Sequence, residues 1–77
     1  MRVYSQGTST YVIGTDDTET ALRAAGITPE THRWSCTLFG YFVRRQGQWR
    51  TASEFRPPKD AKRGICFVGP IHPRKEK

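Results

Sequence analysis

The sequence has little of what a large core, a disulfide scaffold or a membrane segment needs. Only 35% of its 77 residues are hydrophobic, and no run approaches the roughly 20 apolar residues of a membrane-spanning helix. The first residues also lack the apolar stretch of a signal peptide. Two cysteines are too few for a secreted disulfide framework. We therefore expect one small cytoplasmic domain without membrane contact, whose thin core depends on aromatic side chains.

Patterns that carry catalysis are absent. The chain has no G-x-S-x-G, no glycine-rich phosphate loop and no H-E-x-x-H. Asp16 and Asp17 are adjacent carboxylates, but an acid–base pair needs two separate environments, and a helix start explains both residues better. The sequence therefore predicts a protein that is not an enzyme and needs no cofactor.

One set of side chains has the composition of a zinc site. It comprises His32, Cys36, Cys66 and His72. The spacing departs from the compact C-x2-C form, and both cysteines stand among apolar residues in strand-like runs. Free cysteine is commonly a small core residue. We therefore expect two buried thiols, two unrelated histidines and no metal.

Acidic residues are scarce after residue 30. Residues 1–30 carry two arginines against four carboxylates, or −2, and residues 31–77 carry eleven Lys and Arg against three carboxylates, or +8, which together give the net charge of +6. This asymmetry indicates a polarised molecule with one face suited to an anionic partner. Ordinary solubility charge with a basic tail is the alternative.

The longest regular pattern is an alternation over residues 33–45, followed by Gln46-Gly47 and residues 48–51. It predicts a long strand that turns into a hairpin at Gln46-Gly47. One face of this strand is apolar enough to pack a core and carries Trp34, Cys36, Leu38, Gly40 and Phe42. The other has aromatics at its centre and arginines at both ends, and carries Arg33, Ser35, Thr37, Phe39, Tyr41, Val43 and Arg45.

A short helix is predicted over residues 15–26, with Asp16 and Glu19 as a capping-box-like pair and Gly26 as the stop. The remaining strand-forming runs are residues 3–4, 10–13 and 65–68. We expect an α+β domain over residues 1–71, with a three- to four-stranded, mostly antiparallel sheet and one helix on one face. Residues 72–77 are expected to form a flexible basic tail.

An alternative fold comes from a resemblance. Tyr11-Val12-Ile13-Gly14 and the run from Leu22 to Trp34, with Gly26 in the turn and Thr28-Pro29-Glu30-Thr31 as a cap, resemble winged helix-turn-helix domains of the MerR and excisionase type. The resemblance covers about a third of the chain. It implies a second, DNA-reading helix after Gly26 and a hairpin wing over residues 42–50.

The basic and aromatic strand face predicts the function. Aromatic side chains on an open sheet stack on bases, and guanidinium groups bind phosphates. The alternative is that the helix covers the Phe39–Tyr41 face and makes it core. The candidate residues for binding nucleic acid or another partner are Arg33, Phe39, Tyr41, Arg44, Arg45, Trp49, Arg50, Lys59, Lys62 and Arg63.

A second function class is a small protein-interaction factor that docks on an acidic protein surface. The size of the chain is that of many phage or mobile-element regulators and inhibitors, including inhibitors of host defence complexes, and size is the sole basis of this analogy. Residues 65–68 are expected at a sheet edge, where they could pair with a second copy. Both a monomer and a homodimer are compatible with the sequence.

Overall fold

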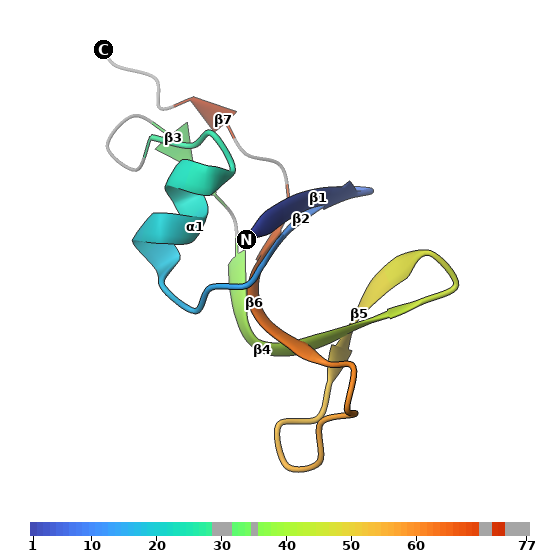
Figure 1. Cartoon of the computed structure of the whole chain (residues 1–77). Helices are drawn as coiled ribbons and strands as arrows, with labels where there is room; N and C mark the ends of the chain where they lie inside the picture. The colour runs from blue at the N-terminus through green and yellow to red at the C-terminus, as the bar shows by residue number, and fades with distance from the viewer. Residues whose placement is uncertain (29–31, 35, 70–71, 74–77) are drawn as a thin grey trace.

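The computed structural model describes residues 1–28, 32–34, 36–69 and 72–73, and for residues 32–33 and 72–73 it describes the backbone alone. Among these residues one short helix lies beside a strongly curved sheet, as Figure 1 shows. The elements in chain order are β1 (Arg2–Gln6), β2 (Ser9–Ile13), α1 (Thr18–Ala24), β3 (His32–Arg33), β4 (Cys36–Arg45), β5 (Gln48–Ala52), β6 (Lys62–Val68) and β7 (His72–Pro73).

The main sheet has five strands in the order β1-β2-β6-β4-β5, and every neighbouring pair is antiparallel. The α+β class is confirmed, but the predicted number of strands was too low. The strand-forming runs at residues 3–4 and 10–13 are two full strands, which pair with each other across the turn at Gly7 and Thr8. β6 also begins at Lys62, three residues before its predicted start, because charged residues extend the ladder beyond the apolar run.

The helix begins one residue later than the predicted capping pair requires. The side chain of Asp17, not Asp16, caps it: the Thr20 backbone N–H donates to Asp17 Oδ2 at 2.9 Å. The capping-box assignment to Asp16 and Glu19 was therefore wrong by one position. Glu19 instead forms a 3.0 Å ion pair with Arg23 on the exposed helix surface.

The hairpin at Gln46 and Gly47 is confirmed. Both residues have positive φ, 53° and 78°, as a two-residue type I′ turn requires. This turn fixes the register of β4 against β5, so that Arg44 lies opposite Trp49 and Val43 opposite Arg50.

The predicted long strand is interrupted before residue 36. His32 and Arg33 form β3, which pairs with β7, and β4 starts at Cys36. Trp34 leaves the apolar face predicted for it and packs edge-on against Phe67, with ring centroids 6.4 Å apart. The strand at His32–Arg33 also contradicts the winged helix-turn-helix alternative, which requires a helix there. Residues 29–31 of its predicted cap lie outside the described residues.

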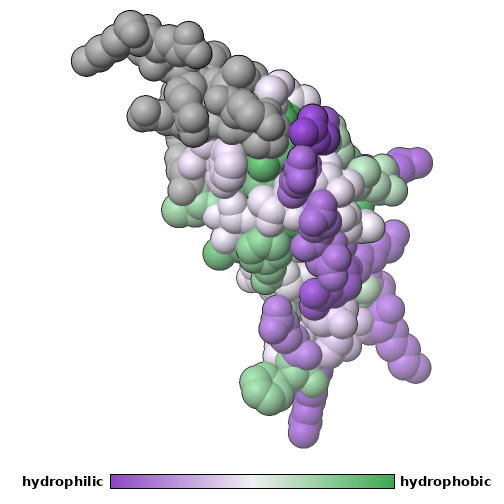
Figure 2. All heavy atoms as spheres, turned by 90° about the vertical axis from the view of Figure 1, so that its left-hand side faces the viewer, coloured by the Kyte–Doolittle hydropathy of each residue, from purple (hydrophilic) through white to green (hydrophobic). Residues whose placement is uncertain are grey.

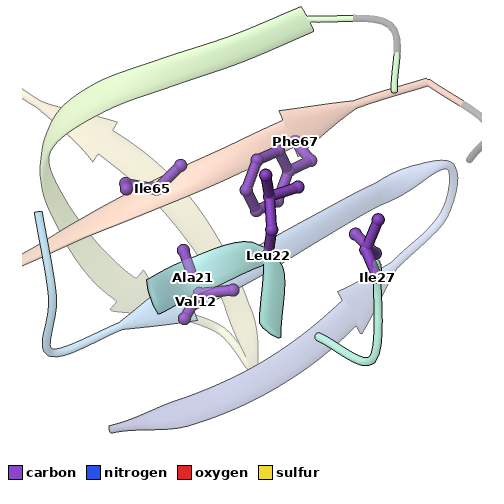
Figure 3. Close-up of a cluster of buried hydrophobic side chains, with 6 residues drawn as sticks. All are labelled: Val12, Ala21, Leu22, Ile27, Ile65 and Phe67. Atoms are coloured by element: carbon purple, nitrogen blue, oxygen red, sulfur yellow. The ribbon is translucent and has the colours of Figure 1, made fainter. Parts of the chain in front are cut away.

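Two apolar clusters lie on opposite faces of the sheet, as period-two alternation requires. On one face, which we call the helix side, α1 packs onto β2 and β6, and Figure 3 shows the side chains of Val12, Ala21, Leu22, Ile27, Ile65 and Phe67 between them. The other face, which we call the inner face, is the concave side of the curl. Its cluster comprises Tyr11, Ile13, Phe42, Trp49 and Cys66.

Two glycines opposite each other, Gly40 and Gly64, allow the strands to approach and curve. A Cβ on Gly64 would lie 2.7 Å from the Val12 carbonyl oxygen, well inside contact distance. Gly40 has a φ of +149°, which side chains with a Cβ rarely adopt. The close approach and the curvature at the centre of the sheet therefore depend on glycine at both positions.

The curl brings the two edge strands together. The side chain of Gln6 on β1 forms two hydrogen bonds with the backbone of Trp49 on β5: Nε2 donates to the carbonyl oxygen at 3.1 Å, and the Trp49 N–H donates to Oε1 at 2.7 Å. The rings of Tyr4 and Trp49 pack 5.1 Å apart beside these bonds. We call this contact the seam. There the Gln6 side chain joins the two edge strands, which have no backbone ladder between them.

β6 is the central strand, between β2 and β4. The expectation that residues 65–68 lie at a sheet edge was therefore wrong, and this run has no free edge with which to pair with a second copy. His72 and Pro73, assigned to the tail, belong to β7, and residues 74–77 lie outside the described residues. No helix in the described part of the chain is long and apolar enough to cross a membrane.

Candidate functional site

Four of the predicted site residues lie together on the helix side of β4, β5 and β6. Tyr41 is the register partner of Arg63, and Arg50 is the partner of Val43, which shares a face with Tyr41 and Phe39. We call Phe39, Tyr41, Arg50 and Arg63 the outer strip.

The helix lies on this face but leaves the outer strip largely open. α1 covers Ile65, the register partner of Phe39, yet Phe39 itself is 54% exposed and Tyr41 is half-buried. With seven residues, α1 is too short to cover both the β2–β6 pair and the middle of β4. Figure 2, which looks onto this side of the molecule, shows apolar patches between hydrophilic side chains. The helix thus covers the β2–β6 part of this face and leaves Phe39 exposed, so the alternative in which this aromatic residue is core was wrong.

The outer strip combines ring surface with positive charge. The Arg63 guanidinium lies 5.1 Å from the centre of the Tyr41 ring, within cation–π distance. It also contacts Asp16 at 3.4 Å, an exposed ion pair of little strength. Arg50 is exposed, and none of the ion pairs between described residues involves it. Both guanidinium groups are therefore able to bind an anion at the surface.

Arg45, another predicted site residue, has an acidic partner in the described structure. It forms two hydrogen bonds with Asp60, of 2.6 and 3.2 Å, that tie the loop of residues 53–61 to the β4–β5 hairpin. The hydrogen bond from Arg45 lowers the pKa of the Asp60 carboxyl, so this carboxylate stays charged in mild acid. Arg45 could therefore bind a phosphate only with a guanidinium that also donates to Asp60.

Three further predicted residues lie on the inner face. Trp49 is buried, 7% exposed, and cannot stack on a base at the surface. The Arg44 guanidinium lies over the rings of Tyr4 and Trp49, at 5.2 and 5.8 Å from their centres, and so covers the seam. Lys62 is the register partner of Phe42 and shares its face. The structure therefore separates these three residues from the outer strip.

The last two predicted residues are isolated from the others. Lys59 is exposed in the loop of residues 53–61. Arg33 lies in β3, and its side chain is outside the described part of the chain.

The cysteine predictions are half correct. Cys66 is buried, and burial raises the pKa of its thiol. Cys36, by contrast, is exposed, and its neighbour on the same face, Leu38, is 47% exposed, although both were expected in the core. Cys36 lies at the end of the β4–β6 ladder, opposite Val68, the last residue of β6. In the described part of the chain no group of three or more His, Cys, Asp or Glu side chains could hold a metal ion, and the side chains of His32 and His72 are not among those described.

Sequence reasoning missed Phe55, which is 98% exposed. It sits in the loop of residues 53–61, where its backbone N–H donates to Ser53 Oγ at 3.2 Å. The available signal was a lone aromatic residue in a polar, proline-containing loop, with no apolar residue spaced to pack beside it.

Comparison with known proteins gives no match. No family model fits the chain, and neither a curated protein nor a solved structure is similar to it. Functional inference therefore depends on the outer strip, the seam and the exposed loop themselves.

Proposed function

We propose that this protein is a non-enzymatic nucleic-acid-binding module, and that the outer strip binds single-stranded DNA or RNA. The observation that carries the proposal is the exposure of Phe39 beside Tyr41 and Arg63, on a sheet face that the helix leaves open. Exposure of a phenylalanine ring to water is unfavourable, and stacking on a base is favourable because it removes that exposed apolar surface.

In the proposed binding mode the aromatic rings contact the bases and the arginines contact the phosphates. Phe39 and Tyr41, two positions apart on one strand face, present two stacking surfaces about 7 Å apart, a spacing that two successive bases of an extended strand can match. Arg50 and Arg63 lie on the neighbouring strands at either side of β4 and bind the phosphates. Specificity for base sequence is not expected from this arrangement, because ring stacking tolerates any base.

The proposal predicts a moderate salt dependence. If Arg50 and Arg63 neutralise two phosphates, the affinity for a single strand falls with a log–log slope of about −1.4. Between 50 and 200 mM salt this amounts to a roughly 7-fold loss of affinity. Binding that is insensitive to salt over this range would contradict the proposal.

The test is a fluorescence-polarisation titration of nuclease-treated protein with labelled single-stranded and duplex DNA and RNA. The double variant Phe39→Ala/Tyr41→Ala removes both stacking rings and is expected to weaken single-strand binding by about 10-fold or more, at about 1–3 kcal/mol per stacked base. Arg50→Ala is expected to weaken it less and to reduce the salt slope by about 0.7.

Two control variants locate the binding. Phe55→Ala removes an aromatic ring outside the strip that is more exposed than Phe39, and Arg23→Ala removes one positive charge on the helix. Both are expected to bind as the unsubstituted protein does. A Phe55→Ala variant that loses binding while the strip variant retains it would place the site on the loop and refute the proposal.

Phe55 favours one other function, docking on a protein surface. A fully exposed ring on a loop anchored by the Arg45–Asp60 pair resembles the aromatic anchors that dominate protein interfaces. In this second candidate function the chain is a small regulator or inhibitor of the phage or mobile-element type that binds an acidic host protein. It predicts a stable complex in nuclease-treated extract that is lost in Phe55→Ala and retained in Phe39→Ala/Tyr41→Ala.

A further inference from the structure

A cavity of about 250 Å³ lies beside the seam, on the inner face and away from the outer strip. Residues from both ends of the curled sheet line it: Arg2 and Tyr4 from β1, Trp49 from β5 and Lys62 from β6. Gly14 forms part of the wall, and a Cβ there would lie 3.1 Å from the Met1 backbone. The cavity therefore exists because the sheet curls and the chain passes close to a glycine.

The cavity has aromatic walls and an unsatisfied donor. Tyr4 and Trp49 both line it, with an angle of 52° between their rings. The indole Nε1 of Trp49 is buried and makes no hydrogen bond with any described residue. A buried donor without an acceptor costs roughly 1–3 kcal/mol and calls for an explanation. One explanation is that a ligand bound in the cavity supplies the missing acceptor.

The charge of the cavity lining is entirely positive. Arg2 and Lys62 line it, no carboxylate among the described residues does, and neither cation is in an ion pair with a described residue. Arg44 is not part of the lining, but its guanidinium lies over the Tyr4 and Trp49 rings that are. The lining therefore suits a ligand that combines a planar ring with an anionic group.

We propose that this cavity binds a single phosphorylated nucleotide unit, with the base against Tyr4 and Trp49 and the phosphate at Arg2 and Lys62. The volume is slightly below that of pockets for drug-sized ligands, so one ring fits and a dinucleotide does not. Because Trp49 Nε1 has almost no exposed surface, an acceptor reaches it only if the indole shifts slightly, and ligand binding is therefore expected to change Trp49 fluorescence.

The ligand has two possible sources, a free mononucleotide or the phosphorylated end of a strand. The second source rests on the proposed function, because the strand would continue from the cavity to the outer strip. Lys62 and Arg63 are adjacent in sequence but lie on opposite faces of β6, so a strand would pass around the start of β6 to reach both sites.

The experiment uses Trp34→Phe protein, in which Trp49 is the one remaining tryptophan. Its fluorescence is followed on addition of adenosine 5′-monophosphate, of adenosine, and of one oligothymidylate with and without a 5′-phosphate. We expect the monophosphate to change the signal, adenosine to bind at least 10-fold more weakly, and Arg2→Ala or Lys62→Ala to weaken monophosphate binding at least fivefold. Calorimetry on the unsubstituted protein gives the same comparison should Trp34→Phe not fold.

The charge-matched control is Arg23→Ala on the helix, which is expected to bind the monophosphate as the unsubstituted protein does. No response to either the monophosphate or the 5′-phosphorylated strand overturns the inference, and so does an equal loss of affinity in Arg23→Ala. A strand that binds equally well with and without its 5′-phosphate, while the monophosphate binds, assigns the cavity to the free mononucleotide. If the monophosphate binds and no strand does, the proposed function fails and the cavity assignment stands.

Discussion

The seam at Gln6 gives the most quantitative prediction about stability. Gln6→Ala removes both hydrogen bonds to the Trp49 backbone, at 3.1 and 2.7 Å. The net contribution of one such bond is about 0.5–1.5 kcal/mol, so the pair is expected to contribute about 2 kcal/mol to the free energy of unfolding. In a domain of this size 1 kcal/mol shifts the Tm by about 4–8 °C, which predicts a fall of about 8–16 °C.

The assay is thermal and urea unfolding followed by circular dichroism. The matched control is Gln48→Ala, which removes the same atoms from an exposed position on β5 and is expected to change stability by less than about 0.5 kcal/mol. If Gln6→Ala and Gln48→Ala unfold at the same temperature, the two bonds at the seam do not hold the edge strands together, and the reasoning is refuted.

Three further predictions concern the sheet and its thiols. Gly64→Ala places a methyl group 2.7 Å from the Val12 carbonyl and is expected to lower the free energy of unfolding by about 1–3 kcal/mol, as overpacking does; unchanged urea unfolding would contradict this. A thiol-reactive dye is expected to label Cys36 rapidly in the native protein and Cys66 only after unfolding; two fast thiols would be inconsistent with the fold. Burial raises the pKa of Cys66 and of Tyr11, so the folded protein holds these protons more tightly than the unfolded chain, and stability is expected to decline as the pH rises above about 9; constant stability from pH 8 to 11 would refute this.

The features that could be predicted from sequence are those fixed by nearby residues. The hairpin at Gln46-Gly47 needs only two residues that tolerate positive φ between two strands. The helix was predicted from a capping pair and a glycine stop, and its start was missed by one residue because two aspartates stand side by side. Local chemistry determines these elements almost alone.

The features that could not be predicted depend on residues far apart in the chain. The seam joins residues 43 positions apart, and nothing near Gln6 indicates its partner. The break before Cys36 was missed because alternation does not show where a strand loses its hydrogen-bonded neighbour. Here β6 ends at Val68, opposite Cys36, and β4 begins at the same point.

The composition of the candidate site was predicted in part. Period two placed Phe39 and Tyr41 on one face and Arg44 with Phe42 on the other, but it could not tell which arginines of the neighbouring strands share the first face. Arg44 and Trp49 instead pack at the seam, because β5 is an edge strand that the curl carries to β1. The extent of helix cover was also beyond prediction, since it depends on how few residues α1 has.

The measurement that tests the proposed function most directly is backbone amide chemical-shift mapping of the protein with a short oligothymidylate. The account predicts that the largest shifts fall on Phe39, Tyr41, Arg50 and Arg63, while the amides of α1 stay nearly unchanged. Shifts concentrated on the loop of residues 53–61, or no shifts at millimolar oligonucleotide and low salt, would contradict it.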